Sequence, residues 1–205
     1  MAEYKLFNEI ISLSDSDIWD IAKNEWIFDS IYESAEPQTC LCGHFPIINI
    51  CVIQNTVNRK ITEVGNCCVK KFFNISDGDA IISSIKQLKK KGVSKSINIK
   101  SLGYIYKKNV ITQWDYDFYK DIHKKRNLTD KQKEIKEIIN KKFLSFTSYE
   151  LHSNISKINV ILKWAEHNSS FDTSFVISLK DTCVKGRPLS IEQKESLNKI
   201  HKLTQ

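Results

Sequence analysis

The sequence predicts a mostly α-helical protein of the α+β class, with one small β-hairpin near the N-terminus. Apolar residues recur at helical spacing through most of the chain, above all from Ser76 onward. A β-branched run at 47–53 is followed by a polar turn and a second short run, the pattern of a hairpin. The chain has 205 residues and is 41% hydrophobic, so it can bury a sizeable core.

Residues 1–37 are predicted to form an acidic helical segment. Ser14 followed three residues later by Asp17 resembles a capping box, in which each side chain hydrogen-bonds an amide of the first helical turn. The apolar positions of this helix fall near one stripe, at Ile18, Ile21, Trp26 and Ile31. Pro37 cannot continue a helix and is predicted to end it.

Residues 38–75 are predicted to form a hairpin followed by a helix. The hairpin has strands at 47–53 and 60–64 and a polar turn at 54–59. The helix is predicted to begin near Asn66–Cys67. Its buried side is predicted to carry Val69, Phe72 and Phe73.

Residues 76–205 are predicted to be helical and to contain a two-fold internal repeat, 97–141 and 158–202. The dipeptide IN and the segments LTDKQ and LSIEQ align at an offset of 61 positions, whereas Asp115 and Phe118 align with Asp172 and Phe175 at 57. We interpret this four-residue shift as a difference in loop length between helices. Each copy is then predicted to contain about three helices.

The repeated segments at 128–132 and 189–193 are interpreted as helix starts rather than as a ligand-binding motif. The spacings Thr129…Gln132 and Ser190…Gln193 are those of capping boxes, preceded by an apolar staple residue. Aromatic side chains in this region are interpreted as core residues rather than base-stacking platforms, at Trp114, Trp164 and Phe171.

Charge is unevenly distributed along the chain. The net charge is +7, but residues 1–39 hold nine acidic and two basic side chains. Residues 57–108 hold twelve basic side chains against three acidic ones. This asymmetry favours a polyanionic partner, of which nucleic acid is the commonest. A lysine-rich surface that only solvates the protein would give the same composition.

Five of the six cysteines lie within 29 residues, in the stretches CLCGH (40–44) and VGNCCVKKFF (64–73) and at Cys51. In a reducing cytosol such a cluster is more often a metal site than a set of disulfides. Zinc favours tetrahedral thiolate and imidazole ligands presented by tight turns. Gly43 permits such a turn, and a thiolate at a helix N-terminus is stabilised by the helix dipole. A knuckle, a hairpin and a helix start together form a treble-clef-like zinc site.

The spacing departs from the usual form of that site, because the first pair is C-x-C and the second pair is adjacent. We predict Cys40, Cys42 and Cys68 as ligands, with His44 as the fourth. Two alternates remain open for the fourth position: Cys51, inside a strand, and Cys67, which points about 100° from Cys68 on a helix. Cys183, far away in the second repeat, is predicted to be a core residue.

Residues 38–73, with C-x-C-G-H, the hairpin and V-G-x-x-C-V-x-x-F, resemble a small zinc-finger segment of uncharacterised phage, large-virus and bacterial proteins. In those proteins the segment often precedes helical repeats similar to FYKDIHKKRNLTDKQ. The resemblance implies a treble-clef-like zinc site at Cys40, Cys42, His44 and Cys68 and a nucleic-acid role. It supplies no reaction. Such proteins also occur in phage–host conflict loci, which implies a toxin or effector role as an alternative.

Enzyme motifs are missing from the sequence. It contains no Walker A loop, no GxGxxG, no H-E-x-x-H and no zinc-deaminase pattern. Glu63 lies near the cysteines in sequence but outside any of these contexts. A non-enzymatic function is therefore expected, with a hydrolase or nuclease as the least favoured alternative.

The sequence thus predicts a zinc-stabilised protein that binds nucleic acid, DNA or RNA. The alternative is a protein-interaction adaptor or a toxin/effector of a bacterial phage-defence system, with the acidic N-terminal helix docking a protein partner. The predicted phosphate-contacting residues are Arg59, Lys60, Lys70, Lys71, Lys89, Lys90 and Lys91. Neither a signal peptide nor a membrane-length apolar run is present, so a cytoplasmic protein without membrane contact is expected.

Overall fold

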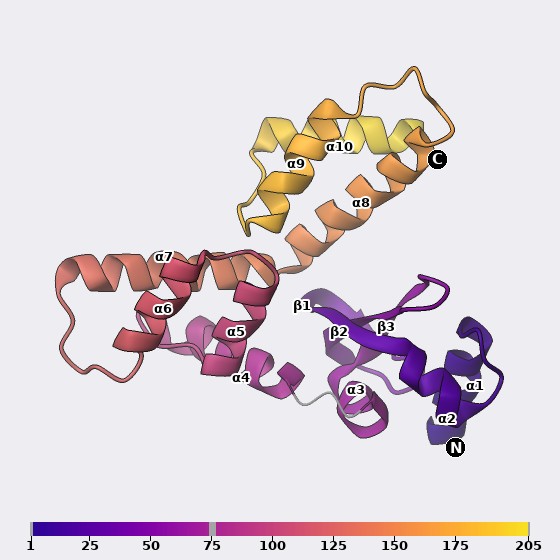
Figure 1. Cartoon of the computed structure of the whole chain (residues 1–205), viewed down its shortest axis with the longest axis horizontal. Coiled ribbons are helices and arrows are strands. Elements are labelled where there is room, and N and C mark those ends of the chain that lie inside the picture. The colour runs from indigo at the N-terminus through magenta and orange to yellow at the C-terminus, as the bar shows by residue number, and fades with distance from the viewer. Residues whose placement is uncertain (1, 74–76, 205) are drawn as a thin grey trace. The chain divides into compact units, whose positions relative to one another are not determined.

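The computed structural model describes residues 2–73 and 77–204, and the side chains of residues 4–70 and 78–204 (Figure 1). The chain divides into two compact units, Met1–Ser83 and Ser84–Gln205. The predicted fold class is confirmed, because most of the described chain is helical and a three-stranded antiparallel sheet lies in the first unit. No helix among the described residues is long and apolar enough to span a membrane.

The first unit is built around its sheet. The helical elements before the sheet are α1 (Ala2–Leu13), α2 (Trp19–Ala22) and the 3-10 helix η1 (Lys23–Glu25). The strands, in the order β1-β2-β3, are β1 (Trp26–Gln38), β2 (Ile47–Asn55) and β3 (Ile61–Gly65). Helix α3 (Asn66–Phe73) begins directly after β3, as predicted.

The central strand β2 supplies the core of this unit. Ile31 of β1, Cys51 of β2 and Val64 of β3 lie side by side in the register, and each is at most 1% exposed. The predicted hairpin is confirmed as β2 and β3. Val69 of α3 is buried as expected, whereas the side chains of Phe72 and Phe73 lie outside the described residues.

The predicted N-terminal helix through residue 36 is wrong, because residues 26–38 form strand β1. No capping box forms at Ser14. Its hydroxyl donates instead to the Ile10 carbonyl and accepts from the Trp26 indole N–H. Pro37 lies in the stretch of β1 where the register with β2 is irregular, so the amide it lacks leaves no ladder bond unmade.

The second unit is built of helices and loops wherever the structure describes it. Its helices are α4 (Asp77–Lys91, which begins in the first unit), α5 (Ile99–Lys107), α6 (Gln113–Ile122), α7 (Asp130–Phe146), α8 (Tyr149–Ala165), α9 (Ser174–Val184) and α10 (Ile191–Leu203). Helix α8 packs against both α9 and α10, and their shared core contains Cys183, as predicted (Figure 1).

Each predicted repeat contains three helices, α5–α7 and α8–α10. Both predicted capping boxes form, at the N-caps Thr129 and Ser190, which are 61 positions apart. The N-caps of the second helices, Thr112 and Thr173, are also 61 positions apart. The four-residue shift predicted at Asp115 is therefore wrong, because one offset relates the starts of both helices.

The first helices of the two copies differ in length rather than in offset. Asn98 caps the 9-residue α5, whereas Asn159 lies inside the 17-residue α8. One aromatic prediction is also wrong. Trp114 is not a core residue but is 60% exposed, and its ring stacks on Phe118 with centroids 5.2 Å apart.

Candidate functional site

A tight turn prepares the cysteine cluster of the first unit. Gly43 has φ of 86°, and its amide donates to the Cys40 carbonyl at 2.7 Å. The Cys40 amide donates to the His44 carbonyl at 3.0 Å, which closes the turn. The amide of Gly65, the last residue of β3, donates to the Cys40 sulfur at 3.1 Å. The turn and the end of the hairpin are therefore fixed to one another at Cys40.

Three cysteine sulfurs meet at this point. The Sγ atoms of Cys40, Cys42 and Cys68 all lie within 4.8 Å of one another, and those of Cys40 and Cys68 are 3.6 Å apart. Four thiolates at 2.3 Å around a tetrahedral zinc would lie about 3.8 Å apart. The side chains are 3%, 9% and 7% exposed. The three predicted ligands are thus brought together, and the group could hold a metal ion.

Hydrogen bonding lowers the pKa of a thiol in this group. The Cys40 and Cys68 sulfurs share a hydrogen bond, which outweighs the opposing effect of burial and lowers the pKa of Cys40. The Gly65 amide lowers it further. The same sulfur–sulfur bond raises the pKa of Cys68, so the two sulfurs share one proton. A metal ion would displace that proton, because thiolates rather than thiols are ligands.

The candidates for the fourth ligand lie in different places. His44 and Cys67 are exposed, and both line the pocket of about 390 Å³ that contains the three clustered cysteines. Their ligand atoms are not part of the group within 4.8 Å. Cys51 is fully buried in β2, and burial raises the pKa of its thiol to about 12. His44 and Cys67 therefore have access to the pocket, whereas Cys51 is a packing residue.

The predicted phosphate-contacting residues of the first unit include two, Arg59 and Lys60, that lie apart from the cysteine cluster. Arg59 and Lys60 follow the turn between β2 and β3, roughly 17 Å along β3 from Gly65. They lie at the end of the hairpin away from the cysteines, not beside them. Lys70 forms an ion pair with Asp79 at 2.8 Å, so part of its charge is compensated. The side chain of Lys71 lies outside the described residues.

The remaining predicted residues, Lys89–Lys91, belong to a larger cluster of basic residues in the second unit. The other members of this cluster were not predicted from the sequence. Lys89–Lys91 form the last turn of α4. The Ser96 carbonyl accepts from Gln87 of α4, and the Ser96 hydroxyl donates to the carbonyl of His123, which ends α6. The two helix ends therefore border the same loop. We define the basic cluster as the exposed residues Lys89, Lys90, Lys91, Lys95, Lys124, Lys125 and Arg126.

The part of this cluster that was not predicted, at 124–126, does stand out in the sequence as a basic run. The run HKKR at 123–126 follows α6, and the run KKKG at 89–92 includes the end of α4. Basic residues are favoured at helix C-termini by the helix dipole, so each run alone reads as a helix end. Only the packing of the 92–97 loop reveals that the two runs adjoin. Asn140 of α7 fixes that loop by donating to the carbonyls of Val93 and Lys95, at 2.6 and 2.7 Å.

The division of charge follows the division into units. Residues 1–83 hold six basic and twelve acidic side chains, a net charge of −6. Residues 84–205 hold 25 basic and twelve acidic ones, a net charge of +13. Within the second unit, burial followed by the charge of Lys95 lowers the pKa of Lys136, which is 8% exposed. Lys95 of the basic cluster thus lies close enough to Lys136 for their like charges to repel one another.

No family model, curated protein or solved structure matches the chain. The resemblance to a zinc-finger segment therefore stays an expectation, and the functional argument rests on geometry and charge.

Proposed function

We propose that this is a zinc-stabilised nucleic-acid-binding protein, in which the first unit holds the metal and the second unit contacts phosphate. The observation that carries the proposal is the basic cluster. It gathers seven exposed cationic side chains from two helix ends and the loop between α4 and α5, in a unit with a net charge of +13.

Zinc is the metal that best fits the donor set. Sulfur ligands are soft, and tetrahedral sites rich in cysteine are typical of zinc. Zinc would supply a structural link here, joining the 40–44 turn to the first turn of α3 through Cys40, Cys42 and Cys68. His44 is our fourth ligand, because it is already part of the turn and lines the same pocket.

Phosphate is the partner that best fits the second unit. Helix dipoles explain why lysines end α4, but they do not explain Lys95, which lies in a loop, or Lys136, which lies inside α7. The repulsion between Lys95 and Lys136 would be relieved by an anion bound nearby. A nucleic-acid backbone presents anions repeatedly, and binding releases its condensed counterions.

Fluorescence anisotropy with mixed-sequence DNA and RNA, single- and double-stranded, at two salt concentrations tests this. Each phosphate contact contributes a slope of roughly 0.7 to 0.9 in log K against log salt. Replacing Lys91 and Lys124 with Glu should therefore lower the slope by roughly 1.5 and weaken binding to every sequence. The matched control replaces Lys199 and Lys202, two exposed lysines of α10, and should leave the slope nearly unchanged.

Two results would contradict the proposal. One is the absence of binding to any of these nucleic acids at micromolar protein in low salt. The other is an equal loss of affinity in the cluster variant and the α10 control. A larger loss on replacing Arg59 and Lys60 would instead move the contact surface to the first unit.

A protein-interaction adaptor is the second candidate, favoured by the net charge of −6 on the first unit. Such a surface suits a basic protein partner. This candidate replaces the first if nucleic acid does not bind.

A further inference from the structure

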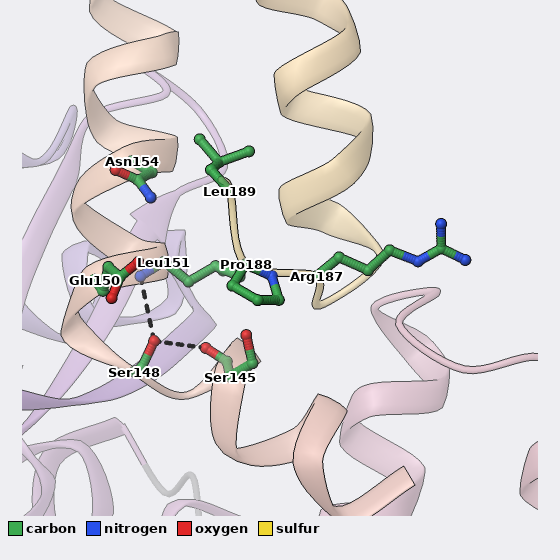
Figure 2. Close-up of a pocket in the computed structure, with 8 residues that line it drawn as sticks. All are labelled: Ser145, Ser148, Glu150, Leu151, Asn154, Arg187, Pro188 and Leu189. Carbon is green, nitrogen blue, oxygen red and sulfur yellow. Dashed lines mark hydrogen bonds between the residues drawn. The ribbon is translucent and has the colours of Figure 1, made fainter. Parts of the chain in front are cut away.

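A second pocket lies in the helical unit, between the start of α8 and the loop that joins α9 to α10 (Figure 2). Its volume is about 250 Å³. One wall consists of Ser145, Ser148, Glu150, Leu151 and Asn154, and the other consists of Arg187, Pro188 and Leu189. Leu151 and Leu189 also belong to the core of α8–α10, so the pocket is floored by fixed apolar side chains.

The loop wall is rigid because both of its ends are fixed. Helix α9 ends in a Schellman motif, in which the Gly186 amide donates to the Cys183 carbonyl and the Arg187 amide donates to that of Thr182. Gly186 has φ of 65°, and a Cβ there would lie 2.7 Å from Val110. The capping box at Ser190 fixes the other end. Pro188 adds its own restriction of φ.

The helix wall is fixed by the N-cap of α8. The Leu151 amide donates to the Ser148 hydroxyl at 3.2 Å, and that hydroxyl donates to the Ser145 carbonyl at 2.7 Å (Figure 2). Glu150, at the rim, forms an ion pair with Lys194 at 2.5 Å. Part of its negative charge is therefore compensated, which weakens its repulsion of an anionic ligand at the rim.

Asn154 presents a carboxamide to the pocket. The residue is 7% exposed, and its carboxamide is not among the fully buried polar groups without a partner, so it reaches solvent through the pocket that it lines. Figure 2 shows this carboxamide on the side of α8 that faces Pro188 and Leu189. A carboxamide that lines a pocket and is not bonded by the surrounding side chains can donate to and accept from a ligand there.

We propose that this pocket accepts one unstacked nucleobase of a single-stranded nucleic acid, with adenine preferred; this rests on the nucleic-acid function proposed above. The volume equals the share of roughly eight liquid waters, which suits a ligand of about ten non-hydrogen atoms rather than a drug-sized one. The apolar side chains of Leu151, Pro188 and Leu189 suit a flat ring. Bases of single strands are free to leave the stack and enter such sites.

Adenine follows from the chemistry of a primary carboxamide. The amide oxygen of Asn154 can accept from the adenine N6 amino group while its nitrogen donates to N7, the two-bond pairing by which asparagine commonly reads adenine. The Arg187 side chain extends away from Asn154 toward solvent (Figure 2). There it can contact a phosphate next to the bound base, which positions the strand without reading its sequence.

Two measurements on the full chain test the inference. In the first, AMP, GMP, CMP and UMP are titrated separately, and the Asn154 side-chain amide signal is followed by NMR. AMP should shift this signal at the lowest concentration. In the second, anisotropy compares adenine-rich with cytosine-rich single strands, and the adenine-rich strand should bind roughly tenfold more tightly.

Two variants separate base reading from folding. Asn154→Leu should remove the adenine preference while keeping the salt dependence that the basic cluster confers. Asn154→Asp replaces a donor with an acceptor and should move the preference toward cytosine, whose N4 amino group pairs with carboxylates. A change of preference is a result that a purely structural Asn154 would not give.

The outcomes distinguish the two proposals. If none of the four nucleotides shifts the Asn154 signal, the pocket proposal is overturned. It is also overturned if strands bind with salt dependence but both Asn154 variants keep the wild-type preference, and then the nucleic-acid function stands. If AMP shifts the signal but no strand binds at micromolar protein in low salt, the pocket stands as a nucleotide site and the proposed function fails.

Discussion

The first unit is stabilised internally by a different kind of contact from the second. In the first unit, the sheet, the cysteine cluster and the buried Glu25 all join residues that are far apart in sequence. Glu25 accepts from the amides of Asp15 and Ser16 and from the side chain of Asn55. In the second unit, side chains cap the starts of α5, α6, α7, α8 and α10, and capping boxes form at Thr112, Thr129 and Ser190.

This difference predicts how each unit responds to damage. In the first unit, one long-range link closes a long loop. Removing the link releases that loop, so the unit loses much of its free energy of unfolding. Removing one local signal in the second unit affects one helix end, and tertiary packing of the remaining helices limits the loss. Three predictions test this contrast, in decreasing order of expected effect.

Loss of the metal should unfold the first unit and spare the second. Structural zinc contributes on the order of ten kcal/mol to the folding of small domains, so chelation, Cys40→Ser or Cys68→Ser should abolish the cooperative unfolding of the sheet. Metal analysis should find about one zinc per chain in the wild type and none in the variants. Circular dichroism and NMR should show the helices of the second unit still folded.

Cysteine variants that spare the cluster provide the controls. Cys183→Ser alters a buried cysteine of the α8–α10 core and should leave the zinc content unchanged. His44→Ala and Cys67→Ala, compared for zinc affinity, identify the fourth ligand, and Cys51→Ala should affect packing alone. A metal-free protein that keeps an intact sheet would overturn the metal site.

Replacing Glu25 with Gln should cost about 2–4 kcal/mol at neutral pH, because a carboxylate that accepts three hydrogen bonds is lost. Burial acts to raise the pKa of Glu25, but the bonds from Asp15, Asn55 and Ser16 outweigh it and hold the pKa below 4.5. The carboxylate therefore contributes its full stability above pH 4.5 and loses it as the pH falls through the lower folded-state pKa.

Urea unfolding of the first unit at several pH values measures this. The difference between the wild type and Glu25→Gln should be largest at neutral pH and should shrink in acid. A difference that stays constant down to pH 3 would mean that the charge of Glu25 is not what stabilises the fold.

Alanine substitutions at two glycines of the second unit should change its stability in opposite directions. Gly186→Ala should destabilise that unit by roughly 2 kcal/mol, because the new Cβ would lie 2.7 Å from Val110 and 3.1 Å from the Lys142 carbonyl, at positive φ. Gly103→Ala in α5 meets nothing within 4 Å and should stabilise by roughly 0.5–1 kcal/mol. Midpoints of chemical denaturation at equal slope report both changes, and equal shifts for the two variants would refute the packing argument.

The helices of the second unit could be predicted because their signals are local. Thr129 and Ser190 each lie three residues before the glutamine that completes a capping box, and that spacing is legible in any sequence. The alignment of Asp115 with Asp172 was misleading, because these two aspartates occupy different positions relative to the starts of their helices. Asp115 completes a capping box, whereas Asp172 precedes the N-cap of α9.

Strand β1 could not be predicted because a bulge conceals its period. Phe28 pairs with Ile53 and Ser30 with Val52, so Asp29 is an extra residue that shifts the alternation of inward and outward side chains. Trp26 and Ile31 are then both buried although they are five positions apart, an odd spacing that breaks the alternation expected of a strand. Only pairing with β2 makes this segment a strand.

The clustering of the cysteines was predictable, but the basic cluster was not. That the sulfurs of Cys40, Cys42 and Cys68 come together follows from spacing and turn chemistry, because a knuckle and a helix start present sulfurs to one point. The basic cluster depends on a loop that brings the ends of α4 and α6 together through Ser96, and no local pattern encodes that packing.

The bulge at Asp29 has a consequence for association between molecules. β1 is an outer strand of the sheet, and a straight outer strand of 13 residues offers its amides and carbonyls to a neighbouring chain for pairing. Asp29 twists the strand near its start, Pro37 removes one donor near its end, and Glu33 and Glu36 would place like charges opposite one another in a symmetric pair. The bulge that conceals the period of β1 in the sequence thus also makes this edge less suited to pairing with a neighbouring chain.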